Sequence, residues 1–508
     1  MQKGRYGSMK LKRIHRIYII MGLFLIFELA GLFFNSGVVA GINSRADKLK
    51  VYATAQRDDA TILPGDIFDR NGNVIVENGY TVNGDRYSSY IDGKAYSQIV
   101  GYTGSRILNP LADSADDVIV GRNAYRLMAF LDEDVWGKNG LYSTTNIDGT
   151  KGQSATLTID HDLQMAVYNI LCNEMSDSED IGSAVVMDAK TGEILSMVSF
   201  PAYDFNDLDG AIEKMQEDES RPYFDPGFPV SYKNSEVPGS IFKVLTSVAM
   251  IDHEMENYTI ENVDFTVDGY TCAATWTQEY PELDMESALA VSSNVYFAKA
   301  ACELGADAFR ETTEKFMLIE GNNDLSSDFG NIRYNWNLDV SENVLAQTGF
   351  GQGETEFSTV YAAMITQAIA NDGKMMQPFM IQKLTDADGK VVYKGKSEML
   401  SQATSKSTAR QVAKNMRLAA QTACEVHEMW DVLETFDRYE VAGKTGTGEN
   451  GDEDVTDNAW FISFAPANDP QYVVVVNQCR NHKFGFQMMP SVASIYEYLF
   501  ESYGNQTE

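Results

Sequence analysis

Cysteine and histidine are scarce in this chain, with five of each among 508 residues. No Cys-x-x-Cys pair occurs, and the pair His253-Glu254 lacks the second histidine of a zinc-protease motif. The cysteines are odd in number and widely spaced, at Cys172, Cys272, Cys302, Cys424 and Cys479. These absences exclude a disulfide framework and argue against a metal enzyme, so we expect neither a metal nor a cofactor.

Basic residues are also few, since 40 lysines and arginines stand against 73 aspartates and glutamates, for a formal net charge of −33. The first sixteen residues hold six of the basic ones and no acid. Nucleic acid requires a basic face for its phosphates, and the rest of this chain is strongly acidic. We therefore exclude a nucleic-acid partner and interpret the acidity as a solvated surface.

One long apolar run is present, from Ile17 to about Ala40. Its first eighteen residues are interrupted only by Glu28 and two glycines, which is near the length that crosses hydrocarbon. The basic residues before it should remain in the cytoplasm, which places the rest of the chain outside. A cleaved signal peptide is the alternative, because Val38 and Ala40 would suit a cleavage site. The run exceeds a typical signal core, so we favour an uncleaved single-pass anchor in the cytoplasmic membrane.

Two folded parts are predicted after the anchor. The first is β-rich, with strand-like runs at Asn73–Glu77 and Tyr80–Asn83 and a hairpin signal at Asn71-Gly72. It contains no group of residues that is typical of a catalytic or metal-binding site, so we interpret it as a pedestal or dimerisation-like module. The predicted organisation is a cytoplasmic tail (1–16), a transmembrane anchor (17–40), the pedestal (41–150) and a second domain (151–508).

The second domain has strands towards both ends and long helices between them. This order predicts an α+β fold, in which one antiparallel sheet has helices packed on it. The predicted strands are Ala155–Ile159, Ala184–Met187, Glu193–Ser199, Ala459–Phe464 and Tyr472–Asn477. The predicted helices are Asp162–Met175, Ser240–Ile251, Met285–Leu304 and Thr359–Asn371.

The segment Ser240-Ile-Phe-Lys243 carries the central chemical signal. It follows Pro238-Gly239, which favours a helix start, and the residues after it are apolar nearly all round, as in a buried helix. Residues three apart share a helix face, so the Lys243 amine should project beside the Ser240 hydroxyl. A serine nucleophile needs an adjacent base, and a lysine removed from water can be neutral near pH 7. The helix start also offers backbone N–H groups to an oxyanion.

The plain alternative for this segment is a helix N-cap followed by a lysine that reaches solvent. Ser-x-x-Lys by itself is a weak pattern that chance produces often. Ser240 is nevertheless the only serine in the chain with a lysine three positions on. The apolar flank also favours a buried lysine.

Two further triplets lie downstream. Ser292-Ser293-Asn294 falls within the predicted helix 285–304, where a hydroxyl can relay a proton and Asn294 can hold a substrate amide. Lys444-Thr445-Gly446-Thr447 precedes the C-terminal hairpin and is predicted to form an edge strand that presents a cation and two hydroxyls to a substrate carboxylate. Gly446, without a Cβ, would let a substrate backbone come close.

Each of these two downstream triplets has a second occurrence that we interpret as structural. Lys190-Thr191-Gly192 lies in a predicted hairpin turn, and Ser341-Glu342-Asn343 lies away from a clear helix. A phosphate-binding P-loop is excluded at Gly443-Lys444-Thr445, because its first glycine would fall at Arg438.

The order Ser-x-x-Lys, Ser-x-Asn, Lys-Thr-Gly resembles the motif set of penicillin-binding proteins and serine β-lactamases. The resemblance extends over about 151–495 and covers Gly152–Gln164, Gly182–Asp204, Pro238–Lys243, Gly351–Gly353, Ile369–Gly373 and Ala459–Pro466. Before it, Gly65–Gly72 resembles the pedestal signature of class B members, with Pro64 in place of the usual arginine. The Asn-Arg-Ala element often found before the nucleophile is only Lys233-Asn234-Ser235 here.

The resemblance implies a penicillin-binding transpeptidase fold and a reaction. Ser240 is implied as the acylated nucleophile, Lys243 as a base and Ser292 as a further catalytic residue. The backbone N–H groups of Ser240 and Thr447 are implied as the oxyanion hole. The substrate-binding positions implied are Asn294, Lys444, Thr445, Gly446 and Thr447. The implied ligands are β-lactams and peptidoglycan stem peptides ending in D-Ala-D-Ala, which a second stem peptide's amine would then crosslink.

Three alternatives remain at this point. Water in place of the amine would make a D,D-carboxypeptidase or a β-lactamase, although the pedestal favours transpeptidation. A different class of function is a β-lactam sensor or a cell-wall scaffold without activity. All three motifs are complete, however, whereas an inactive scaffold should have lost some of their residues. Glu28 suggests contact with a polytopic membrane glycan polymerase, because an acid in a spanning helix usually has a partner. Interfacial placement or protonation of Glu28 in lipid is the alternative.

Overall fold

The computed structural model describes residues 65–82, 86–100, 154–175, 181–204, 229–329, 331–338, 341–386, 388–449, 457–479 and 483–503. All of them belong to one compact unit. The predicted tail, the anchor over 17–40 and much of the pedestal lie outside these residues. In the part that is described, none of the helices combines the length and the hydrophobicity needed to span a bilayer.

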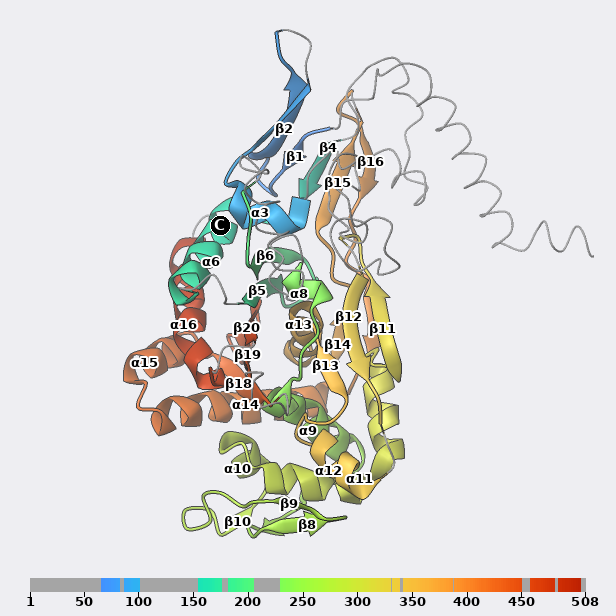
Figure 1. Cartoon of the computed structure of the whole chain (residues 1–508), viewed down its shortest axis with the longest axis vertical. Coiled ribbons are helices and arrows are strands. Elements are labelled where there is room, and N and C mark those ends of the chain that lie inside the picture. The colour runs from blue at the N-terminus through green and yellow to red at the C-terminus, as the bar shows by residue number, and fades with distance from the viewer. Residues whose placement is uncertain are drawn as a thin grey trace, which may run out of the picture. The chain divides into compact units, whose positions relative to one another are not determined.

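A five-stranded antiparallel sheet in the order β18-β19-β20-β5-β6 forms the centre of the fold (Figure 1). Its strands are β5 Ile181–Asp188, β6 Ile194–Phe200, β18 Ala442–Gly448, β19 Asn458–Ala465 and β20 Tyr472–Cys479. Almost every residue of these strands is buried, because helices cover the sheet. The predicted strands 184–187, 193–199, 459–464 and 472–477 are confirmed, as is the edge position of the segment that contains Lys444.

Helices pack on the strands of this sheet as the sequence predicts. The fully buried helix α13 (Thr359–Ala370) contacts β5, β19 and β20. A large apolar cluster joins α6 (His161–Glu174) and α16 (Met489–Tyr498) to the sheet. The edge strand β18 contacts α14 (Lys406–Val426), which is followed by α15 (Trp430–Arg438). The α+β fold is therefore confirmed, together with the predicted helices 162–175 and 359–371.

A second, six-stranded sheet in the order β16-β15-β4-β1-β2-β3 takes strands from both sides of the predicted domain boundary. Strand β4 pairs in parallel with β1 and antiparallel with β15. The strands are β1 Ile67–Phe68, β2 Val74–Tyr80, β3 Arg86–Tyr90, β4 Ser154–Leu157, β15 Ile381–Thr385 and β16 Val391–Lys394. The start of the pedestal is thus hydrogen-bonded into the second domain.

The hairpin signal at Asn71-Gly72 is confirmed by the turn between β1 and β2. Gly72 has a φ of +88°, which glycine adopts without strain. The Asp69 side chain accepts hydrogen bonds from the backbone N–H groups of Asn71 and Asn73, at 2.9 and 2.7 Å. The prediction of a separate strand from Tyr80 is wrong, because Tyr80 is the last residue of β2.

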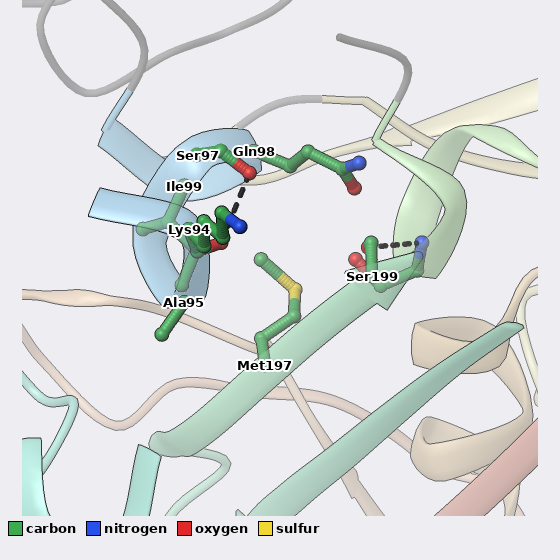
Figure 2. Close-up of a pocket in the computed structure, with 8 residues that line it drawn as sticks. Lys94, Ala95, Ser97, Gln98, Ile99, Met197 and Ser199 are labelled. Carbon is green, nitrogen blue, oxygen red and sulfur yellow. Dashed lines mark hydrogen bonds between the residues drawn. The ribbon is translucent and has the colours of Figure 1, made fainter. Parts of the chain in front are cut away.

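The short helix α3 (Gly93–Val100) docks against β6, and Figure 2 shows this contact around a small polar pocket. Gln98 donates to the carbonyl of Pro201 at 2.5 Å, and the Ser231 N–H donates to Ser199 Oγ at 2.9 Å. The pocket has a volume of about 10 Å³, roughly the space of one water molecule. The pedestal segment thus meets the central sheet through the contact of α3 with β6, in addition to its strand pairing in the six-stranded sheet.

The prediction of one continuous helix over 285–304 is wrong, because the structure interrupts it in the middle. The structure has α10 (Met285–Ala290), a break at residues 291–293, and α11 (Asn294–Lys315). Ser292 has a φ of +57°, and the Ser293 hydroxyl accepts a hydrogen bond from the Tyr296 N–H, which caps the start of α11. The predicted end at residue 304 coincides with a kink at Gly305, where φ is +75°.

Ser341 was expected away from a helix, and this expectation is wrong because it is the N-cap position of α12 (Glu342–Thr348). The remaining elements that the structure describes are short. They are α8 Val230–Lys233, β7 Ile260–Glu261, β8 Phe265–Val267, β9 Tyr270–Cys272, β10 Glu282–Leu283, β11 Gly321–Ser326, β12 Asn331–Trp336, β13 Thr355–Phe357, β14 Lys374–Met376, β17 Met399–Gln402, η5 Gly485–Met488 and η6 Leu499–Tyr503.

Candidate active site

The predicted helix 240–251 is present, but its first turn is a 3₁₀ helix. This turn, η4 (Gly239–Phe242), leads directly into α9 (Lys243–Asp252). Ser240 is half-buried on η4, whereas Lys243 is fully buried at the start of α9. The sequence produces this arrangement because apolar residues on nearly every side of α9 place the helix inside the domain.

Three backbone segments press together around Ser240, and glycine makes this contact possible. Gly239 has a φ of +54°, and a Cβ on it would collide with the carbonyl of Thr447 in β18. Its N–H donates to the carbonyl of Gly351 at 3.0 Å, and a Cβ on Gly351 would collide with the Gly239 carbonyl. The serine turn is therefore held between the edge strand and the loop after α12.

Gly446 belongs to the same contact. A Cβ there would lie 2.7 Å from the carbonyl oxygen of Pro238 and 2.8 Å from the side chain of Ile241. We expected the absent side chain to admit a substrate backbone, but it makes room first for the protein's own serine turn. Trp460 on β19 fixes the same turn, since its indole N–H donates to the Val237 carbonyl at 3.0 Å. Nothing in the sequence pattern pointed to this role of Trp460.

Lys243 reaches the second triplet. Its Nζ lies 2.6 Å from the Ser292 carbonyl oxygen, 2.6 Å from Asn294 Oδ1 and 3.2 Å from Ser292 Oγ. Burial, and then the nearby charge of Lys444, hold the pKa of Lys243 well below its usual range. Burial therefore favours the neutral amine over the ammonium form at this position. Within the described residues it makes no hydrogen bond to Ser240, whose hydroxyl is one helical turn away.

Ser292 stands between two lysines. Its Oγ lies 3.2 Å from the Nζ of Lys243 and 2.9 Å from the Nζ of Lys444. The left-handed φ of +57° costs energy for a residue with a Cβ, and such strain is typical of functional sites. The break in the predicted helix is therefore what brings the Ser292 hydroxyl and carbonyl to Lys243.

Lys444 lies on β18 and is only 2% exposed. Besides Ser292, its Nζ donates to the Thr445 carbonyl at 2.9 Å and lies 3.5 Å from Thr445 Oγ1. Burial lowers the pKa of Lys444 to about 7. The protonation of Lys444 near pH 7 is thus sensitive to a substrate carboxylate that binds beside it.

The two threonines of the third triplet are half-buried, whereas the strand residues between and beside them are buried. The Thr447 hydroxyl accepts a hydrogen bond from the Gly485 N–H at 3.1 Å. Hydrogen bonds therefore join Lys243, Ser292 and Asn294 to Lys444 and Thr445. Backbone packing brings Thr447 to the turn that holds Ser240.

The duplicate triplets lie elsewhere, as predicted. Lys190 is in the turn between β5 and β6, where the Asp188 carboxylate accepts the N–H groups of Lys190 and Thr191 at 2.9 and 2.7 Å. The Ser341 hydroxyl lies 3.2 Å from Asn343 Oδ1 at the start of α12. Neither triplet contributes to the cluster around Ser240.

The family model for the penicillin binding protein transpeptidase domain matches residues 182–495. This chain belongs to that family. The match ends where the sequence resemblance ends, and it starts about 30 residues later than the predicted start at 151. Penicillin-binding protein 3 of Bacillus subtilis is 28% identical over 348 residues, which cover 64% of this chain and 48% of that protein. Peptidoglycan D,D-transpeptidase PbpA of Mycolicibacterium smegmatis is 25% identical over 406 residues, 76% of this chain and 78% of that protein.

Solved structures share the fold. The D,D-transpeptidase domain of a peptidoglycan glycosyltransferase from Eggerthella lenta has a TM-score of 0.70 at 23% identity, covering 87% of this chain and 99% of that one. An imipenem acyl-enzyme complex of penicillin-binding protein A from M. tuberculosis has a TM-score of 0.70 at 20% identity, with the same coverage. The chain spans about half the length of the Bacillus protein and most of the PbpA protein.

Proposed function

We propose that this chain is a class B penicillin-binding protein, a peptidoglycan D,D-transpeptidase that forms an acyl-enzyme on Ser240. The observation that carries the proposal is the convergence of two buried lysines on one serine hydroxyl. Lys243 and Lys444 lie 3.2 and 2.9 Å from Ser292 Oγ, next to the turn that presents Ser240. The substrate is a stem peptide ending in D-Ala-D-Ala, and β-lactams are inhibitors. No cofactor takes part.

Lys243 acts as the base for Ser240. A neutral amine has two N–H groups and one lone pair, and the oxygens at 2.6 Å on Ser292 and Asn294 accept both N–H groups. The lone pair remains to take the Ser240 proton as Oγ attacks the carbonyl between the two D-alanines. The backbone N–H groups of Ser240 and Thr447 receive the negative charge that develops on the carbonyl oxygen.

The second half of the acylation uses Ser292 and the edge strand. Lys444, with the hydroxyls of Thr445 and Thr447, holds the terminal carboxylate, and Asn294 and Gly446 border the bound peptide. Ser292 passes the proton from Lys243 to the departing amine of D-alanine, so the peptide C–N bond breaks as the ester forms. An amine of a second stem peptide then attacks the ester and gives its proton to Lys243. Lys243 passes this proton to Ser240 Oγ as the ester C–O bond breaks, which restores the free serine and the neutral lysine.

Labelling with a fluorescent penicillin tests this assignment. The wild-type chain should carry one adduct on the peptide that contains Ser240, and Ser240→Ala should carry none. Ser235→Ala is the matched control, because Ser235 lies on the same approach segment and its hydroxyl donates to the Glu356 carboxylate at 3.1 Å. An adduct on any other residue overturns the assignment. Rapid release of opened penicillin would favour the β-lactamase alternative instead.

The proposed location is the outer face of a bacterial cytoplasmic membrane, with a single-pass anchor over 17–40 and the pedestal over 41–150. A polytopic glycan polymerase that contacts Glu28 is the proposed partner, because an acid in hydrocarbon needs one. Glu28→Leu should reduce co-purification with that polymerase while penicillin labelling stays unchanged. Unchanged co-purification and growth would rule the contact out.

A further inference from the structure

A side-chain amide joins the two backbone segments that hold the serine turn η4. It belongs to Gln352, which is half-buried in the loop Gly351-Gln352-Gly353 after α12. With the amide oriented to give each atom a complementary partner, Nε2 donates to the Glu449 carbonyl at 3.2 Å and Oε1 accepts the Glu449 N–H at 3.1 Å. Glu449 directly follows the edge strand β18. The amide thus links the loop on one side of the serine turn to the strand on the other.

The loop that carries Gln352 is itself anchored by backbone hydrogen bonds. The Gln352 N–H donates to the Gln347 carbonyl at 3.0 Å. The Gly351 N–H donates to the Thr348 carbonyl at 2.9 Å, and these two bonds tie the loop to the end of α12. The Gly351 carbonyl in turn accepts the Gly239 N–H of the serine turn at 3.0 Å. The amide therefore extends from a fixed support, and it can fix the segment that it binds.

The amide binds the edge strand beside a backbone group that the reaction uses. The ladder between β18 and β19 ends at the pair Gly448 and Asn458, so the Glu449 backbone lies just beyond it. Backbone groups of residues two apart on a strand point to the same side, so those of Thr447 face the same edge as those of Glu449. The Thr447 carbonyl does face the serine turn there, because a Cβ on Gly239 would collide with it. The amide therefore holds the strand about 7 Å from the Thr447 N–H.

The Thr447 N–H is one of the two donors of the proposed oxyanion hole, and such donors work because they are fixed before the negative charge develops. We propose that Gln352 is a positioning residue for acylation. Its amide fixes the backbone of Glu449, which keeps the Thr447 N–H aligned with that of Ser240. This inference rests on the proposed function. Carboxylate binding should not depend on Gln352, because Lys444 lies in the middle of the ladder with β19.

Stopped-flow acylation of the purified full chain by a fluorescent penicillin separates alignment of the oxyanion hole from binding of the ligand. Gln352→Ala should lower the acylation rate constant of the bound complex about thirtyfold, because a displaced donor stabilises the transition state less. The dissociation constant of the complex before acylation should stay unchanged. Gln347→Ala is the matched control, since this half-buried glutamine precedes the same loop and its amide donates to the Asn343 carbonyl within α12, at 3.3 Å. It should acylate as the wild type does.

The variant Gln352→Glu adds a test that a loss of folding would not reproduce. The carboxylate form can accept the Glu449 N–H but repels the Glu449 carbonyl oxygen. The protonated form accepts the N–H and donates to the carbonyl, as the amide does, and this hydrogen bond favours protonation. The acylation rate constant of this variant, relative to that of the wild type, should therefore rise about fivefold from pH 8 to pH 5, the effect of one restored hydrogen bond.

Three results would overturn the proposal. They are wild-type acylation by Gln352→Ala, a loss in Gln352→Ala that is confined to the dissociation constant, and a pH-independent ratio for Gln352→Glu. Failure of the proposed function looks different, because the wild-type chain would then form no adduct on Ser240. Normal acylation of the wild type together with unaffected variants removes only the role of Gln352.

Discussion

At the scale of single residues, the site depends on which of two buried lysines holds a proton. Both amines reach the same hydroxyl, at 3.2 and 2.9 Å, and two ammonium groups there would repel each other. Burial lowers both pKa values, and the charge of Lys444 lowers that of Lys243 further. The arrangement therefore favours a neutral Lys243 beside a Lys444 that is still partly charged at pH 7.

The pKa of Lys444, about 7, sets the expected pH dependence of acylation. As pH rises through this value the free enzyme loses the ammonium group that would hold a substrate carboxylate. The second-order rate constant for penicillin acylation should therefore fall on the alkaline side. Measurement of that constant from pH 6 to 9 checks this expectation, and Lys444→Arg should flatten the alkaline decline because arginine stays protonated. An unchanged alkaline decline in Lys444→Arg would assign it to another group.

The strained Ser292 allows chemistry to be separated from conformation. Ser292→Ala and Ser292→Gly both remove the hydroxyl, so both should lose about a hundredfold or more in acylation rate. Only glycine relieves the left-handed φ of +57°, so Ser292→Gly should be about 1 kcal/mol more stable than Ser292→Ala. Stopped-flow acylation and urea unfolding give the two quantities. Equal stability of the two variants would mean that the backbone at this position stores no strain.

At the scale of elements, the serine turn is positioned by backbone contact, and glycine is what permits it. Gly351→Ala should displace η4, since its new Cβ would meet the Gly239 carbonyl and the Phe242 side chain. We expect at least about a hundredfold loss of acylation rate, the effect of moving a nucleophile by an ångström. Gly389→Ala is the matched control, because Gly389 has a similar φ of +79° and nothing within 4 Å of the added atom. It should lose about 1 kcal/mol of stability and keep its acylation rate.

Much of the element pattern could be predicted from the sequence. The strands β5, β6, β19 and β20 and the helix α13 carry continuous apolar runs between turn residues, which local pattern reveals. The break between α10 and α11 could not be found in this way. Apolar residues continue on both sides of Ser292, and the left-handed turn is stabilised by contacts with Lys243, which is distant in sequence. The close approach of Gly239 and Gly351 is likewise a tertiary contact that a single sequence does not display.

At the scale of the whole molecule, the site joins segments that lie far apart in the chain. Ser240 is on the 3₁₀ turn before α9, Ser292 is at the break between α10 and α11, and Lys444 is on the edge strand β18. The order of the three motifs in the sequence identified them as candidate site residues. Only the fold shows how close their side chains lie to one another. The same folding gives a strongly acidic chain one pair of buried lysines at the place where a carboxylate is expected to bind.

The six-stranded sheet leads to a prediction about how the chain divides. Strand β4 pairs with β1, and fully buried side chains of β1, β2 and α3 (Ile67, Ile75, Val76 and Val100) complete this region. A fragment 151–508 follows the predicted boundary but loses these partners and exposes one edge of β4. It should melt at least about 5 °C below a fragment 60–508, since several fully buried apolar side chains are lost.

Calorimetry of the two fragments, with fluorescent penicillin labelling to confirm a folded site, measures this difference. The shorter fragment should still react through Ser240, because the residues around the site all lie after position 229. Its exposed strand edge should also make it more prone to aggregation, which light scattering detects. Equal melting temperatures would show instead that the division at 150 separates two independently stable parts. The pairing of β1 with β4 would then contribute little to the second domain.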